Sequence, residues 1–294
     1  GYVGLTTGAL FADRGNKVAC VDSNPAVVES LRKGGVHFFE PGLEEIVRKN
    51  LDRRSLLISD DLDAAVKTSK VVFIAVGTPQ REDGSMVLDY VLEAAQKIGG
   101  ALRGVEDFRV VVCKSTVPQG TYLHITRAIN NLLGDGSAWA YVSNPETLAE
   151  GTAVINFERP DRILIGTESD KAFSIMEDLY HPFIRQTGTI IRGSPSDAEL
   201  AKLGANALLS ARVALINEIA DIADHTPGAD AENIRRMIGG DNRIGHQFLY
   251  PGPGYGGSCF PKDSKALVAK AEMDGYTPAL LQQVDPSNEK HKSY

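Results

Sequence analysis

Two short apolar runs that each end in a polar loop constrain the fold of this chain more than any other feature. Residues 71–76 and 109–113 are almost entirely apolar, as expected of parallel strands that helices cover on both faces. They lead into Gly77-Thr-Pro and Lys114-Ser-Thr, at the carboxyl ends of strands, where ligands bind in such sheets. Because helical patterns alternate with these and further strands, the sequence predicts an α/β fold with a Rossmann-like, doubly wound parallel sheet.

The alternation of strands and helices stops near residue 190. Beyond it, residues 196–225 form a long and nearly unbroken helical pattern, and residues 231–238 form another. We therefore predict two domains, a Rossmann domain over residues 1–190 and an all-helical domain over residues 191–294.

The chain opens on a glycine turn that leads into a helix. Gly1-Tyr-Val-Gly-Leu-Thr-Thr-Gly runs into a helical pattern that Gly15 ends, and a short strand with Asp22 at its end follows. An acidic residue about 20 positions after such a turn holds the ribose of a dinucleotide. The first glycine of that fingerprint and the strand before it are not in the sequence, so we expect a fragment of a longer protein. A glycine-started helix without a cofactor is the alternative.

Composition argues against several classes of function. The net charge of −7 gives no general attraction to nucleic acid or to an acidic membrane surface, and no apolar run approaches the ~20 residues of a membrane helix. The three cysteines, Cys20, Cys113 and Cys259, are far apart and follow no metal-ligand spacing. We expect a cytoplasmic protein without a metal site, in which Cys20 and Cys113 pack within strands.

The segment 251–263 is unusually rich in glycine and proline. It reads Pro-Gly-Pro-Gly-Tyr-Gly-Gly-Ser-Cys-Phe-Pro-Lys-Asp, which we interpret as neither helix nor central strand. We expect a stiff loop that presents Cys259 close to Lys262 and Asp263. A thiol beside a cation ionises more readily to the nucleophilic thiolate. The alternative is a tight turn with a buried, unreactive cysteine.

The long helix is expected to begin with a capping box and to carry a polar pair. Ser196 is the predicted N-cap, and Glu199 is its partner three residues later. Lys202 and Asn206 lie four residues apart and therefore share one face of the helix. Their neighbours are small or apolar, which favours a buried functional pair over the alternative of solvated surface residues.

Three further candidates follow strands. Glu146 and Glu150 come after the strand at 140–143, and Thr116 follows the strand at 109–113. The structural alternatives are carboxylates in the first turn of a helix and a helix N-cap. We expect these side chains to meet the cysteine and the Lys–Asn pair at one site.

A thiolate, a lysine, an amide and a carboxylate beside a nicotinamide indicate oxidation of an aldehyde to an acid. A simple alcohol dehydrogenase needs no cysteine. When an aldehyde is oxidised further, a thiolate adds to it, the thiohemiacetal gives up a hydride, and water hydrolyses the thioester with help from a carboxylate. Lys202 and Asn206 are the expected donors to the oxyanion.

Seven motifs follow one another along nearly the whole chain: Gly1-Tyr-Val-Gly-Leu, Val76-Gly-Thr-Pro, Lys114-Ser-Thr-Val-Pro, Asn144-Pro-Glu-Thr-Leu-Ala-Glu-Gly, Pro160-Asp-Arg-Ile, Asp241-Asn-Arg-Ile-Gly and Gly254-Tyr-Gly-Gly-Ser-Cys-Phe-Pro-Lys-Asp. Together, and in this order, they resemble the UDP-glucose/GDP-mannose dehydrogenase family, most closely its members that act on UDP-glucose. The resemblance implies a four-electron oxidation. The C6 hydroxymethyl of a nucleotide sugar becomes a carboxylate while two NAD+ are reduced.

The resemblance also implies roles for the residues that match family motifs. Cys259 is the implied nucleophile. Lys202 and Asn206 would hold the C6 oxygen, and Lys202 would also transfer a proton. Thr116 and Asp263 would position a water molecule near that oxygen.

Further implied roles concern hydrolysis and binding. Glu146 would assist hydrolysis of the thioester. The implied NAD contacts are Gly1, Val3, Asp22, Thr78, Thr116, Glu150 and Lys262. The implied contacts to the nucleotide sugar are Glu146, Thr147, Leu148, Ala149, Glu150, Lys202, Asn206, Arg243, Phe248, Leu249, Tyr250, Pro251, Gly252 and Gly256.

Finally, the resemblance implies an assembly and a longer chain. Arg243 matches a family arginine that reaches into the partner subunit's site, so we expect a homodimer or a higher homo-oligomer in which the helical domain forms the interface. Family members continue into a third, Rossmann-like domain, whereas this chain stops within the connecting helix. The sequence departs from common family residues at Val27, Thr147 and Ala149, which leaves adenosine contacts and the choice of sugar open.

Three alternatives stay open on the sequence alone. The same chemistry on GDP-mannose or a UDP-N-acetylhexosamine is the nearest, although Lys262 argues against the N-acetyl branch. A two-electron hydroxyacid dehydrogenase would release one NADH per substrate and would tolerate loss of Cys259. An inactive NAD-binding or dimerisation fragment would produce no acid.

Overall fold

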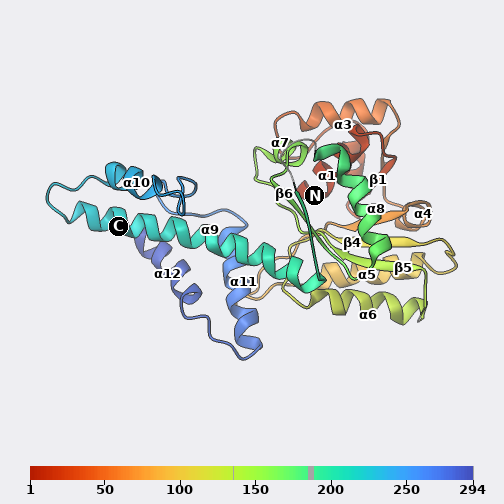
Figure 1. Cartoon of the computed structure of the whole chain (residues 1–294). Helices are drawn as coiled ribbons and strands as arrows, with labels where there is room; N and C mark the ends of the chain where they lie inside the picture. Colours follow the sequence, from red (N-terminus) through yellow and green to blue (C-terminus); the bar gives the residue numbers. More distant parts are fainter. Residues whose placement is uncertain (135, 185–188, 294) are drawn as a thin grey trace. The chain divides into compact units, whose positions relative to one another are not determined.

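The computed structural model describes residues 1–134, 136–184 and 189–293, and the chain forms two compact units (Figure 1). The first unit contains Gly1–Thr78 and Leu88–Glu199. The second contains Pro79–Val87 and the chain from Leu200 onward. The segment Pro79–Val87 lies far from residue 190 in sequence, yet it packs with the second unit. A domain boundary near residue 190 stays a prediction.

The first unit alternates strands with helices. Its elements are α1 (Tyr2–Asp13), β1 (Val18–Val21), α2 (Pro25–Arg32), α3 (Leu43–Asp52), β2 (Leu56–Ser59), α4 (Leu62–Thr68), β3 (Val71–Ile74), α5 (Asp89–Ala101), β4 (Arg109–Cys113), α6 (Thr121–Leu133), β5 (Trp139–Ser143), α7 (Ala153–Glu158), β6 (Arg162–Gly166), α8 (Asp170–Tyr180), the 3-10 turn η1 (His181–Phe183) and β7 (Thr189–Gly193). The second unit holds most of α9 (Pro195–Asp224), with α10 (Ala231–Gly239), α11 (Phe260–Met273) and α12 (Leu281–Lys292).

Strands β3 to β7 form a largely parallel sheet in which they lie in sequence order. β3, β4 and β5 pair in parallel, as do β6 and β7, and β1 pairs in parallel with β2 in a separate two-stranded sheet. One junction differs, because β5 and β6 meet in antiparallel orientation at Ser143 and Gly166. The predicted α/β fold with helices on both faces of a parallel sheet is confirmed.

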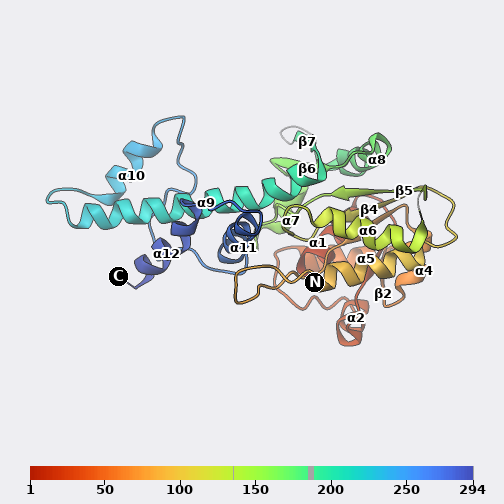
Figure 2. The same cartoon turned by 90° about the horizontal axis from the view of Figure 1, so that it is seen from below.

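The alternation of side chains along β4 separates two apolar cores. Val110 and Val112 pack into a core that residues of α1, α2, α3, α7 and α8 complete. Val111 and Cys113 point to the opposite face and pack under α5 and α6, which lie side by side in Figure 2. Burial raises the pKa of the Cys113 thiol to about 12, so this cysteine is an inert core residue, as predicted.

Side-chain caps fix the starts of several helices. Asn24 accepts a hydrogen bond from the Ala26 amide at 3.0 Å in front of α2, and Asp61 accepts one from the Ala64 amide at 2.9 Å in front of α4. Ser169 caps α8 in the same way. Each cap satisfies an amide that has no partner within its helix and contributes about 1 kcal/mol.

The start of α9 corrects one detail of the sequence prediction. Ser194 and Asp197 form the capping box: the Asp197 amide donates to Ser194 Oγ at 3.1 Å, and the Ser194 amide donates to Asp197 Oδ2 at 2.8 Å. The prediction that Ser196 caps this helix with Glu199 as its partner was wrong, because Pro195 is compatible with the first helical turn and the helix begins there.

Glu199 instead caps the amino end of another helix, α6. Its buried carboxylate accepts hydrogen bonds from the Gly120 amide at 2.8 Å and the Tyr122 amide at 2.9 Å, at the amino end of α6. Gly120, the N-cap of α6, has no side chain that could do so. Tyr141 adds a longer hydrogen bond of 3.5 Å. A residue from α9 thus caps α6 and ties the first turns of α9 to the first unit.

The segment 251–263 is also helical in part. α11 begins at Phe260 with Cys259 as its N-cap, and Pro261 lies in the first turn, where a missing N–H costs nothing. The prediction that the whole segment is non-helical was therefore wrong for its last four residues. The prolines and glycines before Ser258 do form irregular structure.

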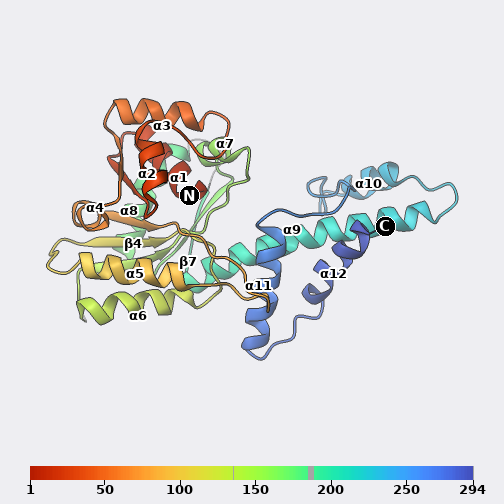
Figure 3. The same ribbon diagram turned by 180° about the vertical axis from the view of Figure 1, so that it is seen from behind.

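The second unit is organised around α9. Figure 3 shows α10 and α12 beside the carboxyl-terminal half of α9, and α11 packs against α12. A small core of Ala214, Tyr255 and Val284 joins α9, the 251–259 segment and α12. Among the helices that the structure describes, none is long and apolar enough to cross a bilayer.

We predict that Glu199 makes stability depend on pH. Burial raises the pKa of its carboxyl to about 7, although the amides of α6 oppose this shift. The pKa of Glu199 is higher in the folded than in the unfolded state, so the protonated carboxyl stabilises the fold. This stabilisation is fully present below pH 4.5 and is lost as pH rises through about 7, which lowers the free energy of unfolding by on the order of 3 kcal/mol. Urea unfolding between pH 5 and pH 8 measures this slope.

Glu199→Gln should remove most of this pH dependence, since the neutral amide keeps one acceptor for the α6 amides but does not titrate. Glu218→Gln, an exposed change on the same helix, is the matched control and should keep the wild-type slope. If the free energy of unfolding depends on pH equally in the wild type and in Glu199→Gln, Glu199 is not the group that causes the dependence.

Candidate active site

The amino end of α1 and the end of β1 meet in the first unit. The Gly1 backbone nitrogen lies 3.5 Å from Asp22 Oδ2, and Asp22 Oδ1 accepts a hydrogen bond from the Asn24 amide at 2.9 Å. Gly8 lets α1 approach β1, since a Cβ atom there would lie 2.4 Å from Cys20 Sγ. Val3 is half-buried in the first turn of α1. This close helix–strand approach beside an acidic strand end suits a dinucleotide.

Glu40 fixes the turn that contains Glu150, and the sequence analysis did not single it out. The Tyr2 hydroxyl donates to Glu40 Oε2 at 2.6 Å, and the Gly151 amide donates to the same oxygen at 2.9 Å. Glu40 is buried, and the Val154 amide also donates to it, at 3.3 Å. Burial and the nearby carboxylate raise the pKa of Tyr2. The hydrogen bond from Gly151 to Glu40 joins residues 111 positions apart, so no local sequence pattern could indicate that Glu40 holds this turn.

Hydrogen bonds join two adjacent strand ends in the first unit. The buried Thr78 hydroxyl, after β3, donates to the Thr116 carbonyl, after β4, at 2.9 Å. Ser115 Oγ donates to the Val76 carbonyl at 2.7 Å. Thr116 itself is half-buried, and the α6 N-cap is Gly120, so the alternative of Thr116 as an N-cap does not hold.

The segment after β5 is anchored by a buried polar cluster. Lys114 Nζ donates to Asn144 Oδ1 at 3.2 Å and to the Tyr180 hydroxyl at 3.3 Å, and Tyr180 donates to Asn144 Oδ1 at 2.6 Å. Asn144 Nδ2 donates to the Leu164 carbonyl at 2.8 Å. Burial raises the pKa of Tyr180, which stays neutral and serves as a donor. This cluster fixes the chain just before Glu146.

Glu146 is buried and folds back on its own loop. Its Oε2 accepts a hydrogen bond from the Leu148 amide at 2.6 Å. The loop is not helical, so the alternative of carboxylates in a first helical turn does not hold. Leu148 is half-buried, while Thr147, Ala149 and Glu150 are exposed.

In the second unit, Asn206 and Asp263 make a buried pair. Asn206 Nδ2 donates to Asp263 Oδ2 at 2.6 Å, and Lys262 Nζ donates to Asp263 Oδ1 at 2.8 Å. Lys202 is also buried, one turn before Asn206 on α9. The sequence expectation of a buried Lys–Asn pair is therefore met, and the alternative of solvated surface residues is excluded.

Cys259 lies one helical turn before this pair's carboxylate. It is exposed, it is the N-cap of α11, and its carbonyl accepts a hydrogen bond from the Asp263 amide at 2.8 Å. Ser258 Oγ lies 3.6 Å from the sulfur. Cys259 is therefore not a buried cysteine, while its reactivity stays a prediction.

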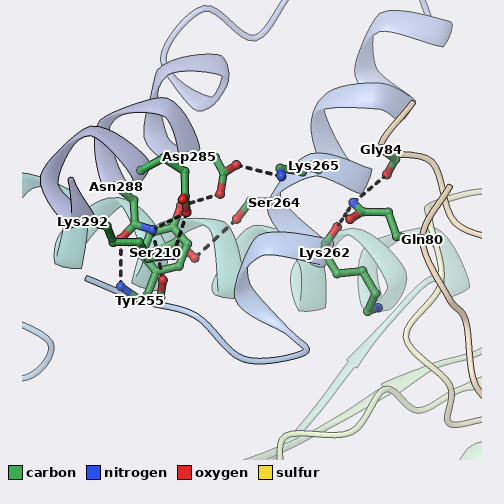
Figure 4. Close-up of polar contacts among 11 residues, drawn as sticks. Gln80, Gly84, Ser210, Tyr255, Lys262, Ser264, Lys265, Asp285, Asn288 and Lys292 are labelled. Atoms are coloured by element: carbon green, nitrogen blue, oxygen red, sulfur yellow. Dashed lines mark hydrogen bonds and ion pairs between the residues drawn. The ribbon is translucent and has the colours of Figure 1, made fainter. Parts of the chain in front are cut away.

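Residues distant in sequence form hydrogen bonds with the backbone on either side of Cys259, at Tyr255 and Lys262 (Figure 4). Gln80 Nε2 donates to the Gly84 carbonyl at 3.2 Å and to the Lys262 carbonyl at 3.4 Å. Asn288, which is fully buried, donates to the Tyr255 carbonyl at 3.0 Å and accepts from its amide at 2.8 Å. No local sequence pattern marks Gln80 or Asn288 for these roles.

The segment predicted to wrap a nucleotide sugar is well fixed. Leu249 is buried, the Arg235 guanidinium lies 4.3 Å above the Tyr250 ring, and the Gly252 amide donates to Asn217 Oδ1 at 2.9 Å. Pro251 is half-buried, and Phe248 and Gly256 are exposed. Arg243, which pairs with Asp241, has a side chain that is 89% exposed.

Within the described ranges, no group of three or more His, Cys, Asp or Glu residues is arranged to hold a metal ion. The predicted site residues thus form two sets. One lies in the first unit, at the start of α1 and in the loops that follow strands, and the other lies in the second unit, on α9, around the start of α11 and in the segment between α10 and α11. That the two sets share one site stays a prediction.

Two family models match most of the chain. Residues 1–184 match the NAD binding domain of the UDP-glucose/GDP-mannose dehydrogenase family, and residues 196–290 match the central domain of the same family.

Individual relatives agree with these matches. The chain is 43% identical to a UDP-glucose 6-dehydrogenase of Pseudomonas aeruginosa, over 99% of this chain and 64% of the relative. It is 45% identical to one of Rhizobium meliloti, over 96% and 64%. A solved structure of a UDP-glucose dehydrogenase from the archaeon Pyrobaculum islandicum superposes with a TM-score of 0.93 at 38% identity, over 99% of this chain and 66% of that one. The chain therefore spans less than two thirds of the length of these curated relatives.

We predict strong energetic coupling between Asn206 and Asp263. Asn206→Ala leaves a buried carboxylate with one donor fewer, and Asp263→Ala removes the acceptor of both Asn206 and Lys262, so each should lower the free energy of unfolding by about 1–3 kcal/mol. Because both changes remove the same contact, the double variant should be more stable than the sum predicts, by at least about 1 kcal/mol.

Urea unfolding of the four proteins completes this cycle. The exposed residues Glu93 and Lys97 of α5, which pair at 2.7 Å, provide the comparison cycle, whose coupling should stay below about 0.5 kcal/mol. Additive effects at Asn206 and Asp263 would show that the 2.6 Å contact contributes nothing.

Proposed function

The chain belongs to the UDP-glucose/GDP-mannose dehydrogenase family, and we propose that the whole protein oxidises the C6 hydroxymethyl of UDP-glucose to a carboxylate. The overall reaction consumes one water and two NAD+ and gives UDP-glucuronate as the carboxylate, two NADH and three protons. The observation that carries the proposal is the exposed Cys259 at the amino end of α11, one turn before the buried Asn206–Asp263 pair.

Cys259 supplies the step that an ordinary alcohol dehydrogenase lacks. The thiolate forms a C–S bond with the aldehyde that the first oxidation produces, and the carbonyl oxygen takes the negative charge. The resulting thiohemiacetal loses a hydride and becomes a thioester. Water then adds, the C–S bond breaks, and the thiolate leaves the acid product. The exposure of Cys259 leaves its sulfur accessible for both the addition and the departure.

Polar residues beside the cysteine are suited to the charge that develops on oxygen. We assign Lys202 and Asn206 to hold the C6 oxygen, with Lys202 also moving a proton, because both are buried on one face of α9. Asp263 fixes the Asn206 amide at 2.6 Å. We assign Asp263 and Thr116 to position water, and Glu146, which is buried after β5, to assist thioester hydrolysis.

The first unit supplies the features of a dinucleotide site. NAD+, when bound, accepts the hydride in each oxidation. The approach of α1 to β1 at Gly8 and the carboxylate of Asp22 fit its binding. The residues that we assign to hold it are Gly1, Val3, Asp22, Thr78, Thr116, Glu150 and Lys262.

The nucleotide sugar would contact two segments and the polar pair on α9. We assign to it Glu146, Thr147, Leu148, Ala149 and Glu150 after β5, Phe248, Leu249, Tyr250, Pro251, Gly252 and Gly256 before α11, and Lys202 and Asn206. The alternative substrates are GDP-mannose, which the family's name includes, and a UDP-N-acetylhexosamine. NADH formation with each sugar nucleotide distinguishes them.

We further propose that the protein assembles as a homodimer through α9. Leu208, Leu215 and Ile222 are each about 60% exposed and lie seven residues apart, so they form one apolar stripe on this helix. The high exposure of Arg243 fits its expected reach into the partner's site. A cytoplasmic location stays a prediction.

Replacing the nucleophile tests the reaction. In the full-length protein, Cys259→Ser should lower formation of the acid by more than about 10³-fold, because a serine hydroxyl in place of the thiolate cannot form the thioester. The measurement is UDP-glucuronate and NADH formed per UDP-glucose consumed, with a ratio of two NADH expected for the wild type.

Cys20→Ala, which removes a thiol from β1, is the matched control and should keep the ratio of two. One NADH per substrate in the wild type, or undiminished acid from Cys259→Ser, would refute the proposed chemistry. Absence of turnover with every sugar nucleotide would favour the alternative of an inactive binding module.

Replacing the centre of the α9 stripe tests the assembly. Leu215→Glu places a charge in the proposed interface, and the dimer should dissociate to monomers in light scattering at micromolar concentration. Leu123→Glu, at an equally exposed leucine of α6, should leave the mass unchanged. An unchanged dimer mass for Leu215→Glu would place the interface elsewhere.

A further inference from the structure

The segment Phe248–Gly252 is held from several sides within the second unit. Phe248 has a φ of 57°, a backbone conformation that aromatic residues rarely adopt, and its ring contacts Phe260, the residue after Cys259. Tyr250 packs under Arg235, which in turn forms two hydrogen bonds with Glu232. These contacts fix the first part of the segment.

Two helices hold the two backbone polar groups of Gly252, the last residue of the segment. The Gly252 amide donates to Asn217 of α9, and the Gly252 carbonyl accepts a hydrogen bond of 2.7 Å from His291 Nε2 of α12. The other ring nitrogen, Nδ1, lies 3.0 Å from both carboxylate oxygens of Asp221 on α9. His291 thus bridges α9 and the segment.

The chemistry of the partners determines the charge of this histidine. A carbonyl oxygen and a carboxylate can only accept hydrogen bonds, so both ring nitrogens must carry a proton for both contacts to form. The bridge therefore requires the imidazolium form. Its side chain and that of Asp221 are mostly shielded from water, at 17% and 29% exposed.

We propose that His291 and Asp221 form a pH-dependent latch that positions the Gly252 peptide and thereby sets the affinity of the Phe248–Gly252 segment for the nucleotide sugar. This inference rests on the proposed function, which gives the segment its ligand. Neither residue belongs to the motifs that identify the family. His291 is a positioning residue, since it acts through Gly252.

The surroundings of His291 give the direction of the pH effect. The hydrogen bond to Asp221 and then that to the Gly252 carbonyl raise the pKa of His291 above its ordinary value of about 6.5. The latch is therefore closed below the raised pKa and opens as pH rises through it. Asp221 is the charged group that faces the ring from α9, and the segment presents the uncharged carbonyl.

Other titratable groups lie close by on the same two helices. On α12, Lys292 and Glu289 pair with each other at 2.7 Å. His225, near the end of α9, contacts the backbone carbonyl of Asp221 at 2.7 Å. It is the other histidine near Asp221 in the described part of the chain, so its variant serves as the control.

The first test is the affinity of the full-length protein for UDP-glucose without NAD+, measured by calorimetry between pH 6 and pH 9. The wild-type Kd should rise about three- to tenfold as the latch opens, since one hydrogen bond with a charged donor is lost. His291→Gln should have a raised Kd at pH 6 that no longer depends on pH. His225→Gln should keep the wild-type pH profile.

The second test does not depend on a ligand. The His291 ring, followed by NMR of 13C-labelled histidine and assigned with His291→Gln, should titrate above pH 6.5, and Asp221→Asn should lower its midpoint. A midpoint that Asp221→Asn leaves unchanged, or a pH-dependent Kd in His291→Gln, would overturn the latch. Failure to bind any sugar nucleotide, with the NMR shift intact, would refute the proposed substrate and with it the role of the latch in affinity, while leaving the His291–Asp221 bridge established.

Discussion

A buried carboxylate must find hydrogen-bond donors, and this requirement decides how several distant parts of the chain are joined. Glu40 finds donors in Tyr2 and the Gly151 turn, and Glu199 finds them in the amides that begin α6. Asp263 finds them in Asn206 and Lys262. An unpartnered carboxylate in these positions would cost several kcal/mol. Each acid therefore fixes the segments that supply its donors.

The same requirement links the framework to the proposed chemistry. Glu40 orders the turn that holds Glu150, the Lys114–Asn144–Tyr180 cluster orders the chain before Glu146, and Asp263 orders the Asn206 amide. The groups that we assign to substrate and cofactor thus lie on segments that hydrogen bonds within the chain hold in place. Preorganised donors of this kind lower the cost of placing charge in a transition state.

Most of the fold followed from local pattern. The apolar runs of β3 and β4 and the long pattern of α9 predicted elements that the structure contains, because burial on both faces of a sheet leaves a clear trace in sequence. The start of α11 was misjudged, because proline was given its usual meaning as a helix breaker although its place in a first turn is favourable.

The site was less accessible to sequence reasoning than the fold. The spacing of Lys202 and Asn206 indicated a shared face, but their roles and that of Asp263 came from family resemblance. Glu40 and Glu199 act across more than 70 residues of sequence, and no local pattern marks such contacts. In the case of Glu199, a local motif suggested the wrong partner, because a capping box has the same appearance wherever a serine precedes an acid by three positions.

The short excursion Pro79–Val87 has a consequence for dissecting this protein. Nine residues between β3 and α5 pack with the second unit, where Gln80 contacts the backbone at Lys262. An expressed piece that ends near residue 190 would contain Pro79–Val87 without the second-unit residues that it packs against. The complementary piece would lack Pro79–Val87. Neither piece would therefore reproduce the structure that it has in the intact chain. The polypeptide leaves the first unit at Pro79, returns to it at Leu88, and leaves it again after Glu199, so more than one crossing connects the two units.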